Sequence, residues 1–446
     1  MGKYFGTDGI RGIANVDLTP RLAYLAGFAA ATVIGEETGA KVRAVIGKDT
    51  RVSSDMLEGA LTAGLCAGGA DVTPIGVLPT PAVAYLTRKT GAELGIVISA
   101  SHNPYEHNGI KFFNINGFKL SDALEAAIES VIDAPDGVAV KTHGEIGRGI
   151  AETHSFDTYI EHIASRAVSD FRGLKVAVDC SNGAASVTAR RLFAGFMCKT
   201  EFIHDRPDGV NINAGCGSTH LDSLRKTVAR GGFDVGFAFD GDADRCLVID
   251  ETGATIDGDI LLALNALSMK KRGTLRANAL VGTIVSNSGL DEFGRAADIE
   301  VYRADVGDRN VIELMLEKGA NLGGETSGHT IFLDDSTTGD GQLSAVKFLN
   351  LLAETGDTAS ELARKIPKYP QVIVNAPAAN ADKAGKMASP QLAEAIGAAE
   401  RELAGAGRIL VRPSGTEAYI RVTVEAETTE KAHECATRVA KVIEQL

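Results

Sequence analysis

The sequence LGIVISASHNP, residues 94–104, joins a short apolar run to a polar turn that ends in proline. Residues 94–98 are apolar or glycine, as in a strand that is buried on both faces. A residue before proline avoids helical backbone angles, so Asn103-Pro104 turns the chain where Ser101 and His102 stand. The pattern predicts a buried strand that presents a hydroxyl and an imidazole, although an ordinary polar turn has the same composition.

The composition is typical of a soluble globular α/β protein with several domains. The 446 residues are 44% hydrophobic and 23% charged, with 50 glycines. Acidic residues outnumber basic ones by 58 to 45, and this net charge of −13 argues against nonspecific nucleic-acid binding. We therefore expect no nucleic-acid partner. The net charge does not exclude a local basic pocket for a phosphate.

The N-terminus and the cysteines predict a cytoplasmic location. Residues 1–7 contain no apolar signal region, and the longest apolar stretch, 22–34, is too short to cross a bilayer. We expect a buried helix there and no membrane partner. The six cysteines include no Cys-x-x-Cys pair, which favours free thiols in a reducing compartment over a zinc site.

Strand-like and helix-like runs alternate in three successive blocks, as in layered α/β domains. The first block is predicted to contain strands at 42–47, 94–98 and 110–113 and helices that begin at Thr19-Pro20, Ser54 and Ser121. The second is predicted to contain strands at 174–179 and 234–239, and the third a strand at 279–285 and a helix at 342–352.

A linker with two prolines, 365–370, separates the third block from a different order of elements. The remaining sequence predicts a strand at 371–375, a helix at 391–403, strands at 408–411 and 418–424, and a helix at 428–446. That order indicates a smaller, two-layer α+β domain. We place the domains at 1–150, 151–256, 257–366 and 367–446.

Three aspartates alternate along DGDADR, residues 240–245, between two strand-like runs. Carboxylates at alternate loop positions can converge on one hard cation. An EF-hand is rejected because Arg245 replaces the glycine of that loop and both flanks are strand-like. We expect Mg²⁺ on Asp240, Asp242 and Asp244, with coordination left open for a phosphate oxygen; a solvated acidic turn is the alternative.

Two further loops carry groups suited to a sugar phosphate. Residues 412–417, RPSGTE, supply a guanidinium, two hydroxyls and a glycine beside which backbone N–H groups can approach an anion, and Arg421 adds a cation. Residues 323–329, GGETSGH, place a carboxylate, a hydroxyl and an imidazole on a glycine-flanked loop. A plain hairpin loop and a structural turn are the respective alternatives.

These four loops, in this order, resemble the α-D-phosphohexomutase superfamily, whose members carry one serine, one metal, one sugar and one phosphate loop. The resemblance covers essentially the whole chain. Residues 3–12 (KYFGTDGIRG), 99–113 and 324–329 look like the bacterial members that act on glucosamine phosphates. Three residues depart from the pattern: Ala243, where glycine is usual, Ala418, where proline is common, and His107, where an acid is expected.

The resemblance implies a fold, a reaction and cofactors. The fold is three similar α/β domains with mixed sheets flanked by helices, plus a smaller C-terminal α+β domain, around a central cleft. The reaction interconverts glucosamine 6-phosphate and glucosamine 1-phosphate through glucosamine 1,6-bisphosphate, and it feeds UDP-N-acetylglucosamine and cell-wall synthesis. Ser101 is carried as phosphoserine and binds one Mg²⁺ together with the aspartates. The expected partner is a small-molecule sugar phosphate, and a homodimer is the assembly considered.

The resemblance also implies a role for each site residue. Ser101 is the nucleophile and phosphate carrier, while Arg11, Arg245 and Lys111 supply cationic support. Lys111 and His102 are the candidates for moving the hydroxyl proton, and His329 lies beside the reacting oxygen. Glu325 and Ser327 bind sugar hydroxyls. The residues expected to bind the distant phosphate are Arg412, Ser414, Gly415, Thr416 and Arg421.

Other functions were weighed against this one. A serine hydrolase needs Gly-x-Ser-x-Gly, which is absent around Ser101, and each Gly-x-Gly lacks the third glycine of a dinucleotide-binding loop. A non-catalytic sugar-phosphate sensor stays open, although Ser101 and the three aspartates argue against it. The main alternative is a phosphoglucomutase or phosphomannomutase, which differs only in the sugar.

Overall fold

The computed structural model describes residues 2–6, 8–403, 405, 407–414 and 418–446. The chain forms two compact units. The first unit comprises Met1–Thr283 and Tyr302–Ala363, and the second unit comprises Ile284–Val301 and Arg364–Leu446. Within the described residues, no helix combines the length and the apolar character that crossing a membrane requires.

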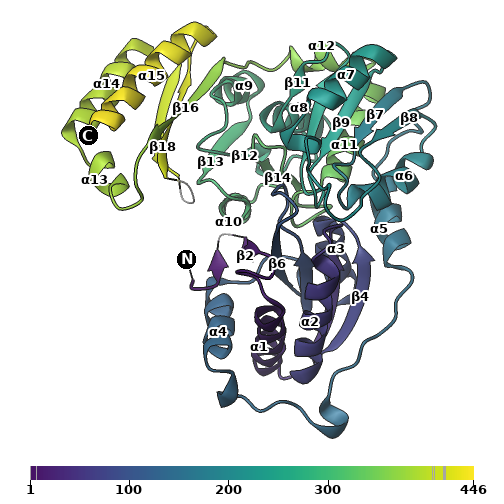
Figure 1. Cartoon of the computed structure of the whole chain (residues 1–446). Helices are drawn as coiled ribbons and strands as arrows, with labels where there is room; N and C mark the ends of the chain where they lie inside the picture. Colours follow the sequence, from purple (N-terminus) through teal and green to yellow (C-terminus); the bar gives the residue numbers. More distant parts are fainter. Residues whose placement is uncertain (1, 7, 404, 406, 415–417) are drawn as a thin grey trace. The chain divides into compact units, whose positions relative to one another are not determined.

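The first unit begins with a six-stranded mixed sheet of order β1-β2-β6-β5-β3-β4 (Figure 1). Its strands are β1 (Phe5–Gly6), β2 (Gly9–Ile13), β3 (Arg43–Lys48), β4 (Asp71–Val77), β5 (Leu94–Ile98) and β6 (His107–Asn114). Strand β3 pairs in parallel with β4 and β5, whereas β6 is antiparallel to β5 and β2. The strands predicted at 42–47, 94–98 and 110–113 are confirmed.

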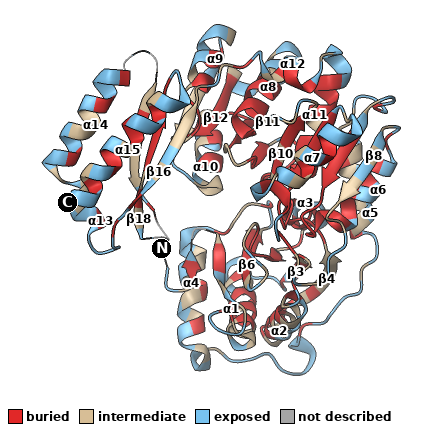
Figure 2. Ribbon diagram, turned by 45° about the horizontal axis from the view of Figure 1, so that its top comes forward, coloured by how far each residue is buried: buried red, intermediate tan, exposed pale blue. Residues whose placement is uncertain are grey.

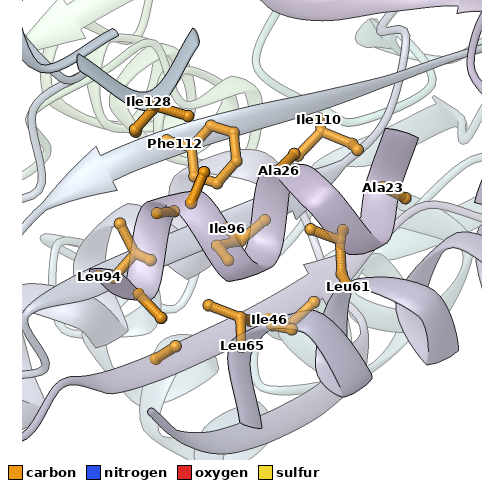
Figure 3. Packing of buried hydrophobic residues seen from close by; sticks show 14 of the residues in the cluster. Ala23, Ala26, Ile46, Leu61, Leu65, Leu94, Ile96, Ile110, Phe112 and Ile128 are labelled. Carbon is orange, nitrogen blue, oxygen red and sulfur yellow. The ribbon is translucent and has the colours of Figure 1, made fainter. Parts of the chain in front are cut away.

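Helices cover both faces of this sheet: α1 (Pro20–Thr38), α2 (Ser54–Ala67), α3 (Thr80–Thr90) and α4 (Asp122–Asp133). Ile96 of β5 packs in one cluster with α1, α2 and α4 (Figure 3), whereas Val97 packs with α3. Because successive strand side chains point to opposite faces, the apolar run 94–98 is buried on both sides. This burial agrees with the sequence prediction.

The predicted helix at 22–34 is confirmed as the core of α1, and close helix packing explains its small residues. Thr19 caps the helix, because its Oγ1 accepts the Leu22 N–H at 3.2 Å. A Cβ added at Gly64 of α2 would lie 2.0 Å from the Tyr24 carbonyl oxygen of α1. Glycine therefore lets the two helix backbones approach each other.

The second sheet of the first unit has the order β11-β10-β9-β7-β8 and is also mixed. Its strands are β7 (Lys175–Asp179), β8 (Lys199–Ile203), β9 (Val235–Phe239), β10 (Cys246–Asp250) and β11 (Thr255–Ile256), and its helices are α5 (Ser155–Ala164), α6 (Ala185–Ala194) and α7 (Asp222–Gly231). The strands predicted at 174–179 and 234–239 are confirmed.

The third sheet has the order β13-β12-β14-β15. Its strands are β12 (Ala279–Thr283), β13 (Glu300–Ala304), β14 (Leu322–Gly324) and β15 (Thr330–Phe332), with helices α8 (Gly258–Lys271), α10 (Asp308–Lys318), α11 (Gly341–Thr355) and α12 (Ala359–Ala363). The prediction of a strand at 279–285 was two residues too long, because the chain turns at Ile284 toward the start of α9 (Gly289–Ala297).

The second unit holds a three-stranded antiparallel sheet of order β16-β18-β17. Its elements are β16 (Gln371–Pro377), α13 (Lys383–Met387), α14 (Pro390–Leu403), β17 (Arg408–Pro413), β18 (Tyr419–Glu425) and α15 (Thr429–Gln445), together with α9. Helices α14 and α15 bury one apolar face each in a common core with the sheet, and their other faces are exposed (Figure 2).

The architecture matches the fold class expected from the sequence, with three mixed sheets flanked by helices and a smaller two-layer domain. The strands and helices predicted from 371 onward agree with the structure to within two residues, whereas the short helix α13 was not predicted. The four domain bounds remain predictions, because compactness alone divides the chain only into the two units.

Candidate active site

The serine loop follows β5 and holds Ser101 in an unusual backbone conformation. Ser101 has φ +51°, the left-handed region that residues other than glycine seldom adopt. Its N–H donates to Ser99 Oγ at 2.9 Å. Arg51 Nη2 donates to the carbonyl oxygens of Ser101 at 3.1 Å and Asn103 at 2.6 Å. These bonds fix a strained turn, as occurs at many functional sites.

The metal loop connects β9 to β10 in a hairpin, since Phe239 pairs with Cys246. The side chains of Asp240, Asp242 and Asp244 are buried, and one carboxylate oxygen of each lies within 4.8 Å of the others. Ser101 Oγ donates to Asp240 Oδ2 at 2.7 Å. The structure therefore brings the predicted serine and the three predicted aspartates together.

This group of aspartates has the properties of a cation site. Burial, with Asp244 and Asp242 nearby, raises the pKa of Asp240 well above its usual range. Among the described residues, Asp242 Oδ1 and Asp244 Oδ1 have no hydrogen-bond partner although both atoms are buried. Three converging carboxylates with free oxygen atoms suit a hard divalent cation. The three aspartates can therefore hold a metal.

Cationic side chains surround the serine and the aspartates. Lys111 Nζ lies 2.9 Å from Asp242 Oδ2 and 3.1 Å from Asp8 Oδ2. Burial opposes its charge, but Asp242 and Asp8 together hold the pKa of Lys111 above its usual value. Arg11 pairs with Asp8, and Arg245 donates its backbone N–H to Asp240 Oδ1 at 3.1 Å. All three predicted cations thus lie in this network.

His102 Nδ1 lies 3.4 Å from Ser101 Oγ. Burial, and then the charges of Arg245 and Arg11, lower the pKa of His102 to about 4. The imidazole is therefore neutral near pH 7, so a ring nitrogen can accept a proton. His102 thus lies beside the serine hydroxyl, and its role in moving the hydroxyl proton stays a prediction.

An ion-pair chain that the sequence did not reveal continues from Lys111. Asp8 accepts from Lys119 Nζ at 2.6 Å, and Lys119 Nζ also lies 2.7 Å from Asp308 Oδ2. Asp8 belongs to the quoted segment 3–12, but no sequence signal pairs it with Lys119 or Asp308. These ion pairs connect Asp8, near the start of the protein, to Asp308 in the first turn of α10.

The sugar loop is the turn between β14 and β15. Glu325 Oε1 accepts the Gly307 N–H at 3.2 Å, and Thr326 Oγ1 donates to Asp259 Oδ2 at 2.8 Å. Ser327 Oγ is buried and has no hydrogen-bond partner among the described residues. Its binding to a sugar hydroxyl stays a prediction.

His329 connects the sugar loop to the metal loop. Its Nε2 accepts the Gly339 N–H at 3.0 Å, so the ring proton is on Nδ1, which lies 3.5 Å from Asp244 Oδ2. The backbone N–H of Cys246 also donates to the Gly328 carbonyl at 3.1 Å. His329 therefore faces the aspartates and is buried, with 3% of its surface exposed.

The phosphate loop lies in the second unit. Arg412 and Arg421 stand opposite each other on β17 and β18. Burial, and then the charge of Arg421, lower the pKa of Arg412, and its Nε has no partner among the described residues. Lys383, which the sequence analysis missed, donates to the Ser414 carbonyl at 2.6 Å. Gly415 and Thr416 lie outside the described residues.

The structure describes the three residues at which the sequence departs from the superfamily pattern. Ala243 has φ +53°, so it adopts the conformation that glycine favours. His107 is the first residue of β6, and its N–H donates to the Pro104 carbonyl at 3.2 Å. The Ala418 carbonyl accepts the Ala378 N–H at 3.0 Å.

A second group with metal-ligand chemistry consists of Asp179, His204 and Cys216, and its carboxylate is hydrogen-bonded to the protein backbone. Both Asp179 oxygens accept backbone N–H groups, from Ser181 at 2.9 Å and Gly217 at 3.0 Å. His204 Nδ1 lies 3.1 Å from the same carboxylate. Burial raises the pKa of the Cys216 thiol to about 12, so it stays protonated. We interpret this group as a structural contact between loops.

Family models match successive parts of the chain. They are the phosphoglucomutase/phosphomannomutase alpha/beta/alpha domains I, II and III and the C-terminal domain, which match residues 2–138, 157–253, 257–369 and 373–442. The phosphoglucosamine mutase of Acetivibrio thermocellus is 48% identical over 446 residues, which cover 100% of this chain and 99% of that protein. The chain belongs to the phosphoglucosamine mutase family.

Other relatives agree with this assignment. The phosphoglucosamine mutase of Moorella thermoacetica is 48% identical over 97% of both chains. The family consists of isomerases that transfer a phosphoryl group within a sugar phosphate, so the chain is an enzyme of that class.

Solved structures share the fold. A phosphoglucomutase/phosphomannomutase family protein from Burkholderia thailandensis matches with a TM-score of 0.81 at 25% identity, covering 98% of this chain and 97% of that chain. Aspergillus fumigatus N-acetylphosphoglucosamine mutase, solved with GlcNAc-6P and magnesium, matches with a TM-score of 0.66 at 18% identity, covering 95% and 96%.

Proposed function

We propose that this chain interconverts glucosamine 6-phosphate and glucosamine 1-phosphate, with Ser101 as the phosphate carrier. The observation that carries the proposal is the 2.7 Å hydrogen bond from Ser101 Oγ to Asp240 within a buried group of three aspartates. Family membership supports the reaction class, because relatives that are 48% identical over nearly the whole chain are phosphoglucosamine mutases.

The reaction consists of two phosphoryl transfers. In the first, the phosphoryl group on Ser101 Oγ moves to the C1 oxygen of glucosamine 6-phosphate, which gives glucosamine 1,6-bisphosphate and a free serine hydroxyl. In the second, the phosphoryl group on the C6 oxygen moves to Ser101 Oγ, which leaves glucosamine 1-phosphate. Each transfer breaks one P–O bond and forms another, and one hydroxyl proton passes in the opposite sense.

Charge neutralisation and positioning account for most catalysis of phosphoryl transfer. Asp240, Asp242 and Asp244, with an oxygen of phosphoserine 101, would hold Mg²⁺, which when bound neutralises charge on the transferred group. Lys111, Arg245 and Arg11 supply fixed positive charge in the same network. Because ion pairs with Asp8 and Asp242 engage the Lys111 ammonium, the geometry favours His102 over Lys111 as carrier of the hydroxyl proton.

The two remaining loops recognise the substrate. We assign sugar-hydroxyl binding to Glu325 and Ser327, since the buried Ser327 hydroxyl has no partner among the described residues. Cross-strand pairing of Arg412 with Arg421 places two cations side by side, an arrangement that a phosphate would stabilise. We assign the non-reacting phosphate to these two arginines together with Ser414, Gly415 and Thr416.

Steady-state kinetics on three sugar phosphates test the proposed substrate. We expect kcat/KM to be highest for glucosamine 6-phosphate, with slow conversion of glucose 6-phosphate, because shared hydroxyl contacts give only partial discrimination. A higher kcat/KM for glucose 6-phosphate or mannose 6-phosphate would instead support a phosphoglucomutase or phosphomannomutase. Absence of turnover with every sugar, with Mg²⁺ and bisphosphate present, would support a non-catalytic sensor.

A further inference from the structure

Asn213 contacts the serine loop from a distant part of the chain. It lies between β8 and α7, where its N–H donates to the Ser181 carbonyl at 2.9 Å. Its side-chain Nδ2 donates to the carbonyl oxygens of Ser101 at 2.9 Å and Asn103 at 3.0 Å. Only 7% of the residue is exposed, so these bonds are shielded from water.

The same two carbonyl oxygens also accept from Arg51, which belongs to the segment after β3. Each carbonyl has two lone pairs, so the amide and the guanidinium together satisfy both oxygens fully. These carbonyls flank His102 and directly follow the left-handed backbone of Ser101. Donors from two separate parts of the chain, Asn213 and Arg51, thus stabilise the conformation of the serine loop.

The metal loop meets the serine loop at the same point. A Cβ added at Gly241 would lie 2.6 Å from the Ser101 carbonyl oxygen and 2.8 Å from Asn213 Nδ2. Glycine at this position lets the backbone next to Asp240 contact both groups. Asn213 therefore lies where the serine loop and the metal loop contact each other.

We propose that Asn213 is a positioning residue that fixes the direction of Ser101 Oγ relative to Asp240. This inference rests on the proposed role of Ser101 as phosphate carrier. In-line transfer needs the carrier oxygen in a fixed position, and a displacement of about 1 Å can slow a reaction roughly 100-fold. The amide of Asn213 reaches the serine loop through these two carbonyls, so we expect its loss to change the transfer rate and not the binding of sugar.

Two substitutions of Asn213 test this role. The native residue has φ +58°, which glycine also adopts, so Asn213→Gly removes the amide without straining the backbone. Asn213→Asp keeps the shape but places a carboxylate oxygen against two carbonyl oxygens. We expect kcat to fall roughly 10- to 100-fold in Asn213→Gly and further in Asn213→Asp, with KM for glucosamine 6-phosphate unchanged.

Asn182 provides a matched control. It has φ +50° and is 8% exposed, and its side chain donates to the Asn211 carbonyl at 3.3 Å and accepts the Arg206 N–H at 3.2 Å, neither of which belongs to the serine loop. Asn182→Gly should lower the melting temperature about as much as Asn213→Gly, yet keep the wild-type kcat. A wild-type kcat in Asn213→Gly, or an equal loss of kcat in both glycine variants, would overturn the inference.

Ser101→Ala, measured in the same assay, separates this inference from the proposed function. If Ser101→Ala is inactive and Asn213→Gly is fully active, the carrier role stands and the positioning role fails. If Ser101→Ala retains wild-type activity, the carrier role fails, and the positioning inference fails with it. Intact mass of each variant after treatment with glucosamine 1,6-bisphosphate gives its phosphate content, so that kcat is expressed per phosphorylated enzyme.

Discussion

Ser101 Oγ and Asp240 Oδ2 lie 2.7 Å apart although 139 positions separate the two residues in the chain. Each residue stands just beyond the carboxyl end of a fully buried strand, β5 for Ser101 and β9 for Asp240. Ligands of α/β proteins bind at such strand ends, where polar loop residues follow an apolar framework. The two sheets thus provide the nucleophile and a metal ligand.

Asp240→Asn should remove the stabilisation that Mg²⁺ gives to the protein. Wild type should gain about 2.7 kcal/mol of unfolding free energy when Mg²⁺ reaches about 100 times its Kd. The variant has lost one ligand charge and should gain much less. Without metal its melting temperature should change little, because the wild-type carboxylate is itself unfavourable in its charged form. Thermal melts with and without Mg²⁺ measure both quantities.

Asp250→Asn is the control for the metal prediction. Asp250 is also buried, but it lies at the end of β10 and accepts from Thr252. This variant should melt at a lower temperature in all conditions and still respond to Mg²⁺ as wild type does. An unaltered Mg²⁺ response in Asp240→Asn would contradict a metal site on these aspartates.

Ser327→Ala should weaken sugar binding without affecting stability. The hydroxyl has no protein partner among the described residues, so its loss should leave the free energy of unfolding unchanged. Loss of one hydrogen bond to substrate, worth about 1 kcal/mol, should raise KM about fivefold. Thr326→Val is the neighbouring control, because it removes a bond to Asp259 and should lower the melting temperature. An unchanged KM in Ser327→Ala would mean that the sugar binds elsewhere.

Local sequence signals account for most of the fold. Helix α1 was predicted because Thr19-Pro20 supplies a cap and a first-turn proline, and β5 because residues 94–98 are uniformly apolar. The serine and metal loops were recognisable since polar residues follow such strands directly. These signals involve residues close together in the sequence, which is why they can be interpreted without a structure.

Contacts between distant loops could not be predicted in this way. Arg51 and Asn213 both donate to the Ser101 carbonyl, yet no local sequence pattern around either residue indicates this partner. The same holds for the ion pairs that Lys119 makes with Asp8 and Asp308. Periodicity and capping determine elements, whereas the packing of one sheet against another determines which loops touch.

Arg412→Ala should raise KM for glucosamine 6-phosphate roughly tenfold or more, since a hydrogen bond to a charged group contributes about 1.5–3 kcal/mol. The melting temperature should stay constant or rise, because like charges directly opposite on neighbouring strands destabilise a sheet. Steady-state kinetics and thermal melts check the two expectations.

Arg408→Ala provides the comparison on the same strand. Arg408 Nη2 lies 2.9 Å from Glu425 Oε1, so its loss should lower the melting temperature and leave KM unchanged. Equal KM values for Arg412→Ala and wild type would contradict the assignment of the non-reacting phosphate to the phosphate loop.

The stability contributed by His204 should depend on pH. The Asp179 carboxylate, 3.1 Å from His204 Nδ1, raises the pKa of His204 above its ordinary value of 6.5. The charged imidazole therefore stabilises the folded state fully below pH 6.5, and this contribution is lost as the pH rises through the raised pKa. The melting temperature of wild type should exceed that of His204→Gln by more at about pH 5 than at about pH 9. A difference that is constant or grows with pH would contradict the ion pair.

The phosphate on Ser101 is the most direct test of the account. Wild-type protein treated with glucosamine 1,6-bisphosphate is analysed by intact mass and phosphopeptide mapping, and its conversion of glucosamine 6-phosphate is compared with that of Ser101→Ala. We predict one added phosphate, located on Ser101, and no conversion by Ser101→Ala even with bisphosphate present. Conversion by Ser101→Ala at the wild-type rate, or a phosphate on a different residue of the wild type, would contradict the carrier role.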